Sequence, residues 1–210
     1  SALEERTFTV RIIGPPGIGK SDFLTNLISS DIRKKYLKKV NDRLLFIRIN
    51  TEELTEISTL EFYRYTVKRF LEIINNSQFP LKINEDEEKL LNLKDSLLLI
   101  EKIKSMITIL VQDGWQLLVI IDGFDCLGEN LDATFFSNLK SFRDISKFNV
   151  SYLITAAKDP SKESYFEKVY SLYKLVSPFI FYLKPSRIDE SLAEIEAHSK
   201  QRSIKLTREE

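Results

Sequence analysis

Residues 14 to 21 of this 210-residue chain combine glycines, prolines, a lysine and a serine in an order that suits phosphate binding. They read Gly14-Pro15-Pro16-Gly17-Ile18-Gly19-Lys20-Ser21. Glycines let the backbone curl around a phosphate, and the curled N–H groups form an anion nest at the start of a helix. Lys20 would then reach the β- and γ-phosphates of a nucleotide, and the Ser21 hydroxyl would bind Mg²⁺.

The flanks of this segment match what a phosphate-binding loop requires. An apolar, β-branched run over 7–13 predicts a strand, and an amphipathic run predicts a helix from about Lys20 to Ser30. The prolines stiffen the loop before a ligand arrives. A glycine-rich turn with an unrelated lysine is the alternative, which the matching flanks disfavour. The expected nucleotide-binding residues are Gly14, Pro15, Pro16, Gly17, Ile18, Gly19, Lys20, Ser21 and Asp22.

Three polar residues after later apolar runs are candidates for the rest of the site. Asp122 ends the run 118–121 and is expected to hold Mg²⁺ opposite Ser21, directly or through water. Asp125 could position or deprotonate a water in line with a γ-phosphate, and Thr155 could sense that phosphate or orient the water. The alternatives are a turn-capping aspartate, a solvated aspartate and an ordinary strand residue. The expected catalytic residues are thus Lys20, Asp122, Asp125 and Thr155, and the expected metal ligands are Ser21 and Asp122.

The elements that must position these residues alternate along the chain. Apolar runs predict strands at 7–13, 44–49, 116–121, 150–156 and 179–183. Helical spacing predicts helices at 20–30, 60–75, 95–113, 134–146, 161–175 and from 186 to about 201, with Pro178 stopping the fifth. Strands that alternate with helices indicate an α/β fold with a central parallel sheet, whose ligands lie at the carboxyl ends of the strands. The segment 77–92 breaks the pattern and is interpreted as a surface insertion rather than a partner-binding element.

Composition limits the other functions that the chain could have. Lys+Arg and Asp+Glu balance at 31 each, so there is no overall basic field to attract nucleic acid or an anionic membrane. The single cysteine, Cys126, excludes an internal disulfide and favours a reducing, cytoplasmic location. It is interpreted as a small packing residue rather than a nucleophile. No signal peptide and no apolar run long enough to span a membrane is present.

With these motifs placed, nearly the whole chain resembles the AAA+ and STAND class of P-loop ATPases, which act as nucleotide switches. GPPGIGKS at 14–21 is similar to their Walker A motif, and VIIDGFD at 119–125 is similar to their Walker B motif. The Asp-Gly-x-Asp form is similar to the NACHT branch. Segment 135–159 looks like the helix and sensor strand of STAND-like ATPases, and 177–210 looks like their last core strand and the entry into a helical lid.

The resemblance implies a P-loop NTPase fold, a three-layer α/β/α sandwich of about five strands in the order 5-1-4-3-2. It implies an ATPase core over 1–185 and the start of a lid over 186–210, with ATP or ADP and Mg²⁺ bound between them. A capping box at 207–210 suggests that the natural chain continues, so we expect self-association or partner domains beyond Glu210. Neither a nucleic acid nor a membrane is indicated as a partner of this segment.

Departures from the family pattern decide between functions. Cys126 stands where NACHT proteins usually have another acidic residue, and Ala156-Ala157 stands where many STAND proteins have Thr-Arg. No arginine lies between 161 and 178, where an arginine finger is expected. The preferred hypothesis is therefore a regulatory ATPase module that hydrolyses ATP slowly. The alternatives are a small-molecule or nucleotide kinase, and a pseudo-ATPase scaffold that only binds nucleotide.

Overall fold

A computed structural model describes most of the chain. The described residues are 9–36, 43–75, 87–146, 149–173 and 176–184. The expected lid at 186–210, the capping box at 207–210 and most of the insertion at 77–92 lie outside them. Within the described residues, no helix is both long and apolar enough to cross a membrane.

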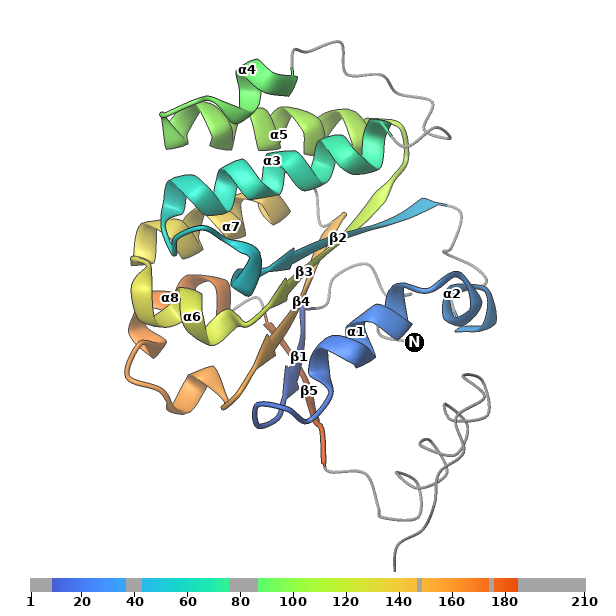
Figure 1. Cartoon of the computed structure of the whole chain (residues 1–210), viewed down its shortest axis with the longest axis vertical. Coiled ribbons are helices and arrows are strands. Elements are labelled where there is room, and N and C mark those ends of the chain that lie inside the picture. Colours follow the sequence, from blue (N-terminus) through green and yellow to red (C-terminus); the bar gives the residue numbers. More distant parts are fainter. Residues whose placement is uncertain (1–8, 37–42, 76–86, 147–148, 174–175, 185–210) are drawn as a thin grey trace, which may run out of the picture.

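Five parallel strands form the centre of the molecule (Figure 1). They are β1 (Thr9–Ile13), β2 (Leu44–Asn50), β3 (Gln116–Asp122), β4 (Val150–Ala156) and β5 (Val176–Tyr182). Their order is β2-β3-β4-β1-β5, which confirms the predicted order 5-1-4-3-2. Residues 117–121 of the interior strand β3 are all buried, as expected for a parallel strand that is covered on both faces.

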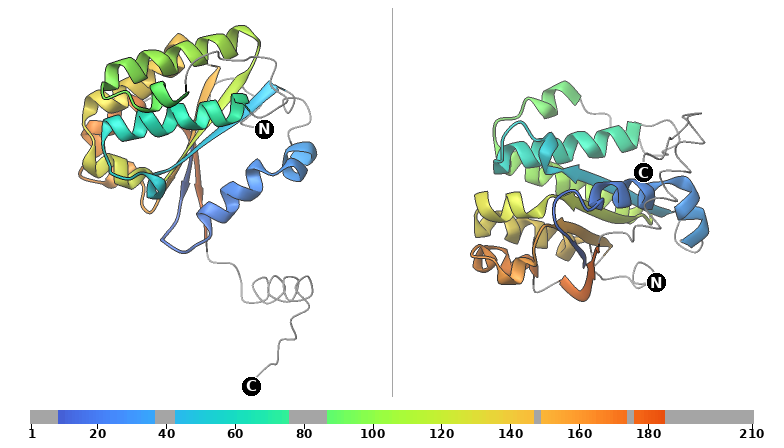
Figure 2. Two further views of the ribbon diagram at one scale, coloured as in Figure 1. Left: turned by 45° about the horizontal axis from the view of Figure 1, so that its top comes forward. Right: turned by 60° about the horizontal axis from the view of Figure 1, so that its bottom comes forward.

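Helices cover the two faces of the sheet unequally (Figures 1 and 2). They are α1 (Lys20–Ile28), α2 (Ser30–Tyr36), α3 (Thr59–Asn75), α4 (Glu87–Leu91), α5 (Ser96–Gln112), α6 (Phe124–Asn130), α7 (Ala133–Ile145) and α8 (Phe166–Tyr173). One face carries α1, whose Leu24 packs against Ile12 and Ile120 of the sheet. The other carries α3 and α5 to α8, whose aromatic and aliphatic side chains form the larger core with Ile49 and Val119. The predicted three-layer α/β/α sandwich is confirmed.

The helix starts follow from side-chain caps that the sequence contains. Ser58 Oγ accepts from the Glu61 backbone N–H at 3.2 Å where α3 begins, whereas the Glu61 side chain pairs with Arg64 and does not complete a capping box. Asp95 and Asp132 cap α5 and α7 in the same way. These caps explain why the predicted starts of these three helices lie within one residue of the observed ones.

Three predicted elements differ from the structure. The first helix ends at Ile28, because Ser29 has an extended ψ of 146°, and α2 follows as a separate helix. The helix predicted to start at 161 starts at Phe166 as α8, after a short 3₁₀ turn η3 (Pro160–Lys162). Pro178 does not stop that helix but lies inside β5, next to an irregularity in the pairing with β1. β5 is an edge strand, which is where a sheet can contain a proline, a residue without an N–H to donate.

The insertion predicted over 77–92 is not entirely a surface feature. Its described end contains α4, where Leu90 is buried in the larger core. A helix that was not predicted, α6, starts directly after β3. Its first turn places Asp125 near the ends of the central strands.

Candidate functional site

The loop between β1 and α1 has the backbone that its glycines allow. Gly17 and Gly19 have φ values of 78° and 90°, a region that residues with a Cβ rarely adopt. Gly14 is needed for a different reason, because an added Cβ would lie 2.9 Å from Ile18 Cγ2. Gly14 N–H donates to the Ala156 carbonyl at 3.1 Å, which ties the start of the loop to the end of β4.

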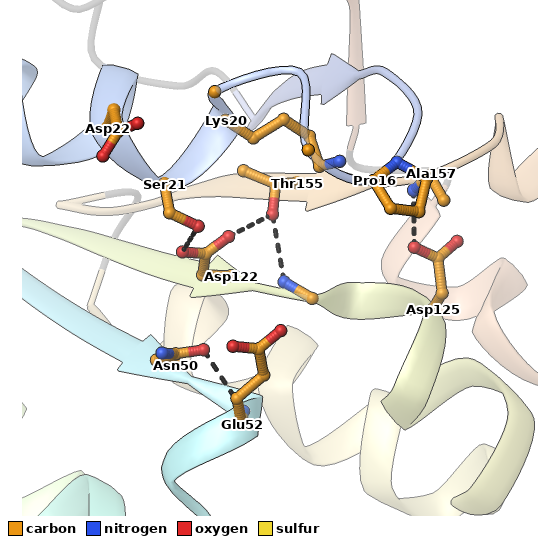
Figure 3. A pocket seen from close by; sticks show the side chains of 13 residues that line it. Pro16, Lys20, Ser21, Asp22, Asn50, Glu52, Asp122, Asp125, Thr155 and Ala157 are labelled. Carbon is orange, nitrogen blue, oxygen red and sulfur yellow. Dashed lines mark hydrogen bonds between the residues drawn. The ribbon is translucent and has the colours of Figure 1, made fainter.

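A cavity of about 360 Å³ lies between this loop and the carboxyl ends of β2, β3 and β4 (Figure 3). Its lining residues are Pro16, Gly17, Gly19, Lys20, Ser21, Asp22, Asn50, Glu52, Asp122, Gly123, Asp125, Thr155 and Ala157. The structure therefore brings together all four expected catalytic residues and both expected metal ligands. Of the loop residues named from the sequence, Gly14, Pro15 and Ile18 do not line the cavity.

Lys20 opens α1 with its ammonium group folded back over the loop. Its Nζ donates to the carbonyl oxygens of Gly14 at 2.6 Å and Pro15 at 3.0 Å. The lysine charge is thus held at the mouth of the loop by the backbone of the loop itself. A phosphate in the cavity could replace these carbonyl oxygens as acceptor.

Ser21 and Asp122 meet although they are distant in the sequence. Ser21 Oγ donates to Asp122 Oδ2 at 2.9 Å, and Thr155 Oγ1 donates to Asp122 Oδ1 at 2.6 Å (Figure 3). Gly123 N–H donates in turn to Thr155 Oγ1 at 3.0 Å. Thr155 is completely buried, so its hydroxyl orients the carboxylate from the interior of the protein. A carboxylate beside a hydroxyl is an oxygen donor set that suits Mg²⁺ with further ligands from water and phosphate.

Arg48 of β2 places a positive charge beside Asp122, and the sequence patterns did not predict this residue as part of the site. Its Nη2 lies 2.7 Å from Asp122 Oδ2, and its Nη1 donates to Thr25 Oγ1 at 2.9 Å. Burial by itself raises the pKa of Asp122, but hydrogen bonds from Thr155, Arg48 and Ser21 together with the arginine charge hold that pKa below its usual value. Asp122 is therefore ionised at neutral pH and already has a counter-ion.

Asp125 reaches the cavity from the first turn of α6, and both of its carboxylate oxygens accept hydrogen bonds. Ala157 N–H donates to Oδ2 at 2.6 Å, and the Tyr165 hydroxyl donates to Oδ1 at 3.1 Å. Burial, followed by the charge of Asp125, raises the pKa of Tyr165, so the hydroxyl stays a donor. Asp125 thereby links α6 to the end of β4 and to Tyr165.

Two lining residues come from the end of β2 and were missed. Asn50 pairs with Asp122 in the sheet register, and Glu52 lies in the 3₁₀ turn η2 (Thr51–Glu53) that follows. In a parallel sheet, ligands bind at the carboxyl ends of the strands. The polar residues that follow β2 could therefore have been recognised as site candidates by the same argument that applies to Thr155 near the end of β4.

Cys126 is exposed, so its interpretation as a packing residue is wrong. It lies on α6, one residue beyond Asp125, and its side chain faces solvent. Partial desolvation of the thiol and the neighbouring carboxylates of Glu129, Asp125 and Glu52 raise its pKa, which disfavours the thiolate that a nucleophile needs.

The similarity of this chain to known proteins lies in its fold. No protein-family model and no curated protein matches the sequence. A Walker-type ATPase of Pyrococcus abyssi matches with a TM-score of 0.62 and 16% identity, covering 98% of this chain and 57% of that one. The ORC2 protein of Aeropyrum pernix, solved with ADPNP and ADP, matches with a TM-score of 0.61 and 17% identity, covering 94% and 48%. The ORC1 protein of the same organism, solved in complex with DNA, matches with a TM-score of 0.62 and 13% identity, covering 95% and 46%.

The chain therefore spans about half the length of these solved structures. The parallel sheet in the order β2-β3-β4-β1-β5 and its flanking helices match the P-loop NTPase α/β fold of these solved structures. The narrower STAND or NACHT assignment stays a prediction.

Proposed function

We propose that this chain is an ATP·Mg²⁺-binding ATPase module of the AAA+ class, which hydrolyses ATP slowly and acts as a nucleotide switch within a larger protein. The observation that carries the proposal is the hydrogen bond of 2.9 Å between Ser21 and Asp122. It joins the hydroxyl at the head of α1 to the carboxylate at the end of β3, inside a cavity that Lys20 also lines. These are the positions from which a P-loop ATPase holds a metal and a triphosphate.

The proposed roles follow the geometry of the cavity. The backbone of residues 14–21 and the amino end of α1 bind the phosphates, and Lys20 leaves its carbonyl partners to bind the terminal phosphates. Ser21 and Asp122 hold Mg²⁺, which neutralises charge on the phosphate oxygens when it is bound. Thr155 orients Asp122 through its buried hydroxyl, and it is close enough to the cavity to sense the γ-phosphate.

Slow turnover, and hence a switch, is proposed from the surroundings of this site. The sequence between 161 and 178 has no arginine that could act as a finger, a group that raises turnover by roughly 10³–10⁵ in related enzymes. Asp125, the sequence-based candidate for positioning water, is engaged by two donors. A STAND-like module would suit this behaviour, with its core over 1–185, a lid starting at 186 and partner domains or self-association beyond.

A nucleotide-binding scaffold without turnover is the second candidate, and one observation favours it. Arg48 lies where a cation is needed, 2.7 Å from the carboxylate oxygen of Asp122. The arginine could keep Asp122 neutralised in a protein that uses nucleotide only to support its fold. Measurable ATP hydrolysis that is lost on Asp122→Ala would exclude this candidate. We propose no nucleic-acid partner for this chain, because its acidic and basic side chains balance; the DNA in the ORC1 structure is bound by that protein.

The proposal is tested by calorimetric titration with ATP and ADP in the presence of Mg²⁺. Lys20→Ala should weaken ATP binding on the order of tenfold or more, and ADP binding less, because the lysine contacts the terminal phosphates. Lys68→Ala, which removes an exposed lysine from α3, is the matched control and should change neither affinity.

Two results would contradict the proposal. Folded wild-type protein that binds neither nucleotide would overturn it outright. Equal loss of ATP and ADP affinity on Lys20→Ala would leave a nucleotide site but remove the terminal-phosphate role of this lysine.

A further inference from the structure

We infer that Glu52 is the carboxylate that positions and deprotonates the water attacking the γ-phosphate, an inference that rests on the proposed function. Glu52 lines the cavity from η2, and no motif of the sequence draws attention to it. In Figure 3 its carboxylate points across the cavity toward Asp122, from the side opposite the phosphate-binding loop. A water between this carboxylate and a bound phosphate chain would face the terminal phosphate.

The turn that presents Glu52 is anchored at both ends. Asn50 Oδ1 accepts from the Glu52 backbone N–H at 3.2 Å, and Leu54 N–H donates to the Thr51 carbonyl at 3.3 Å. Thr51 is buried, and its hydroxyl donates to the Gly123 carbonyl at 3.2 Å. The backbone of Glu52 is thus fixed relative to the end of β3, as a group that must orient a water requires.

The Glu52 carboxylate is uncommitted, in contrast to its neighbours. Within the described parts of the chain it makes no hydrogen bond and no ion pair. Asp122 accepts from three side chains, and Asp125 accepts from Ala157 N–H and the Tyr165 hydroxyl. Asp22 also lines the cavity, but in Figure 3 it lies beyond Ser21, apart from the other carboxylates. Glu52 therefore has free lone pairs on the side of the cavity where a water could approach.

The position directly after Asp122 cannot provide such a carboxylate. It is occupied by Gly123, with φ 86°, and a Cβ built there would lie 2.2 Å from Thr51 Oγ1. The turn that holds Glu52 thus fills the space that a side chain at 123 would need. Position 123, after β3, has no carboxylate, and Glu52, in the turn after the neighbouring strand β2, supplies one to the same cavity.

The proposed hydrolysis needs only water and ATP as reactants. The water oxygen forms a bond to the γ-phosphorus while the bond from that phosphorus to the β,γ-bridging oxygen breaks. The electron pair of the broken bond leaves with ADP. One water proton passes to the Glu52 carboxylate and then to the phosphate product or solvent, which returns the carboxylate to its ionised form.

The experiment compares Glu52→Gln with Glu53→Gln, a matched control on the same turn. Glu53 is engaged by Tyr65 and Asn50 and does not line the cavity. Glu52→Gln should lower ATP turnover by about 100-fold or more, the usual effect of losing a general base. Its ATP·Mg²⁺ affinity and its thermal midpoint should match the wild type, because the side chain is exposed and unbonded. Nucleotide extracted from the variant after incubation should be ATP, whereas the wild type and Glu53→Gln should yield ADP.

Each other outcome overturns the inference. If Glu52→Gln hydrolyses ATP at the wild-type rate, Glu52 does not act on the water. If Asp125→Asn or Asp22→Asn, and not Glu52→Gln, loses turnover while keeping affinity and stability, the role belongs to that residue. Wild-type protein that binds ATP without turnover removes the catalytic role but leaves the binding site standing. Wild-type protein that fails to bind ATP overturns the proposed function itself, and the catalytic role with it. Glu52→Asp adds a second test, since shortening the side chain should lower turnover with the charge retained.

Discussion

At the scale of single residues, the carboxylate of Asp122 is where the two halves of the site join. Thr155 bonds one of its oxygens, and Ser21 and Arg48 share the other. Its side chain is only 6% exposed, so water contributes little to the stability of the charge. Arg48 therefore compensates the charge of Asp122 in the ligand-free protein.

Replacement of Arg48 should show how far the stability of the ligand-free protein depends on this compensation of the Asp122 charge. Arg48→Met is expected to lower the free energy of unfolding of the ligand-free protein by roughly 1–3 kcal/mol, because it leaves a buried carboxylate without its cation. ATP with Mg²⁺ should stabilise the variant more than the wild type, since the metal would restore a positive charge beside Asp122. Urea unfolding with and without nucleotide measures both effects.

Arg43→Met is the control for this prediction. The ion pair of Arg43 with Asp113 is exposed, at 57% and 38% of the two side chains, so its loss should change stability by less than about 1 kcal/mol. Equal effects of the two substitutions would show that Arg48 has no special role at Asp122.

At the scale of elements, the site depends on how two short segments meet after neighbouring strands. β2 continues into η2, and β3 continues into α6 through Gly123. Because β2 and β3 pair in register up to Asn50 and Asp122, the two segments start side by side. Their contact at Thr51 and Gly123 fixes where Glu52 and Asp125 enter the cavity.

A methyl group at Gly123 should disturb this contact. Gly123→Ala places a Cβ 2.2 Å from Thr51 Oγ1 at a φ of 86°. Backbone strain and overpacking together should cost about 2–4 kcal/mol of unfolding free energy. Gly114→Ala has a similar φ of 87° with no atom within 4 Å of the new Cβ, so it should show the strain alone.

A double substitution separates the two causes. Adding Thr51→Ala removes the clashing oxygen and should recover the overpacking part of the loss. Denaturant midpoints of Gly123→Ala, Gly114→Ala, Thr51→Ala and the double variant measure the difference. No recovery in the double variant would mean that the clash at Thr51 is not the cause.

Sequence patterns predicted the strands, helices and loop that form because of their own local residues. They did not predict features that depend on where a strand lies in the sheet. The apolar runs gave β4 with its observed bounds, since a buried strand needs no more than apolar side chains. From the sequence, Pro178 predicts the end of a helix, because its place in an edge strand cannot be seen there. The loop residues 14–21 were found for the same local reason. Arg48 and Glu52 were not, because strand pairing brings them to the site.

At the scale of the whole molecule, a buried ion pair holds the β1 side of the sheet together. Arg11 of β1 lies 3.1 Å from Asp159, beyond the end of β4, and the Tyr173 ring at the end of α8 stacks below its guanidinium at 4.5 Å. Tyr173 also accepts a hydrogen bond from Arg11 and donates one to Asp159. The three residues thus connect the strand before the phosphate-binding loop to the last described helix.

This ion pair should make stability depend on pH. Burial by itself raises the pKa of Asp159. Hydrogen bonds from Ser161, the charge of Arg11 and the Tyr173 hydroxyl lower that pKa by more than burial raises it, so the pKa lies below its usual value. The unfolded chain therefore binds the proton more tightly, and the stabilisation is present above about pH 4 and is lost as pH falls through the lowered pKa. Asp159→Asn should destabilise the protein at pH 7 by on the order of 3 kcal/mol and flatten its acid dependence.

Urea midpoints at several pH values between neutral and acid measure this effect. Asp113→Asn, which breaks the exposed pair with Arg43, should leave the pH profile of the wild type unchanged. An Asp159→Asn profile parallel to that of the wild type would assign the acid dependence to other carboxylates.

The position of Lys20 in the ligand-free protein has a consequence for selectivity among anions. Its ammonium group already has two carbonyl acceptors, so binding is an exchange of partners rather than the filling of a vacant charge. A small anion such as sulfate would replace these two bonds and gain little beyond the contacts of the loop. A polyphosphate chain also extends to Ser21 and the metal position, where it meets partners that the loop carbonyls cannot satisfy. On the proposed function, the loop should therefore bind a small anion more weakly than a polyphosphate chain, because the carbonyl partners of Lys20 compete with either ligand and only the chain also reaches Ser21.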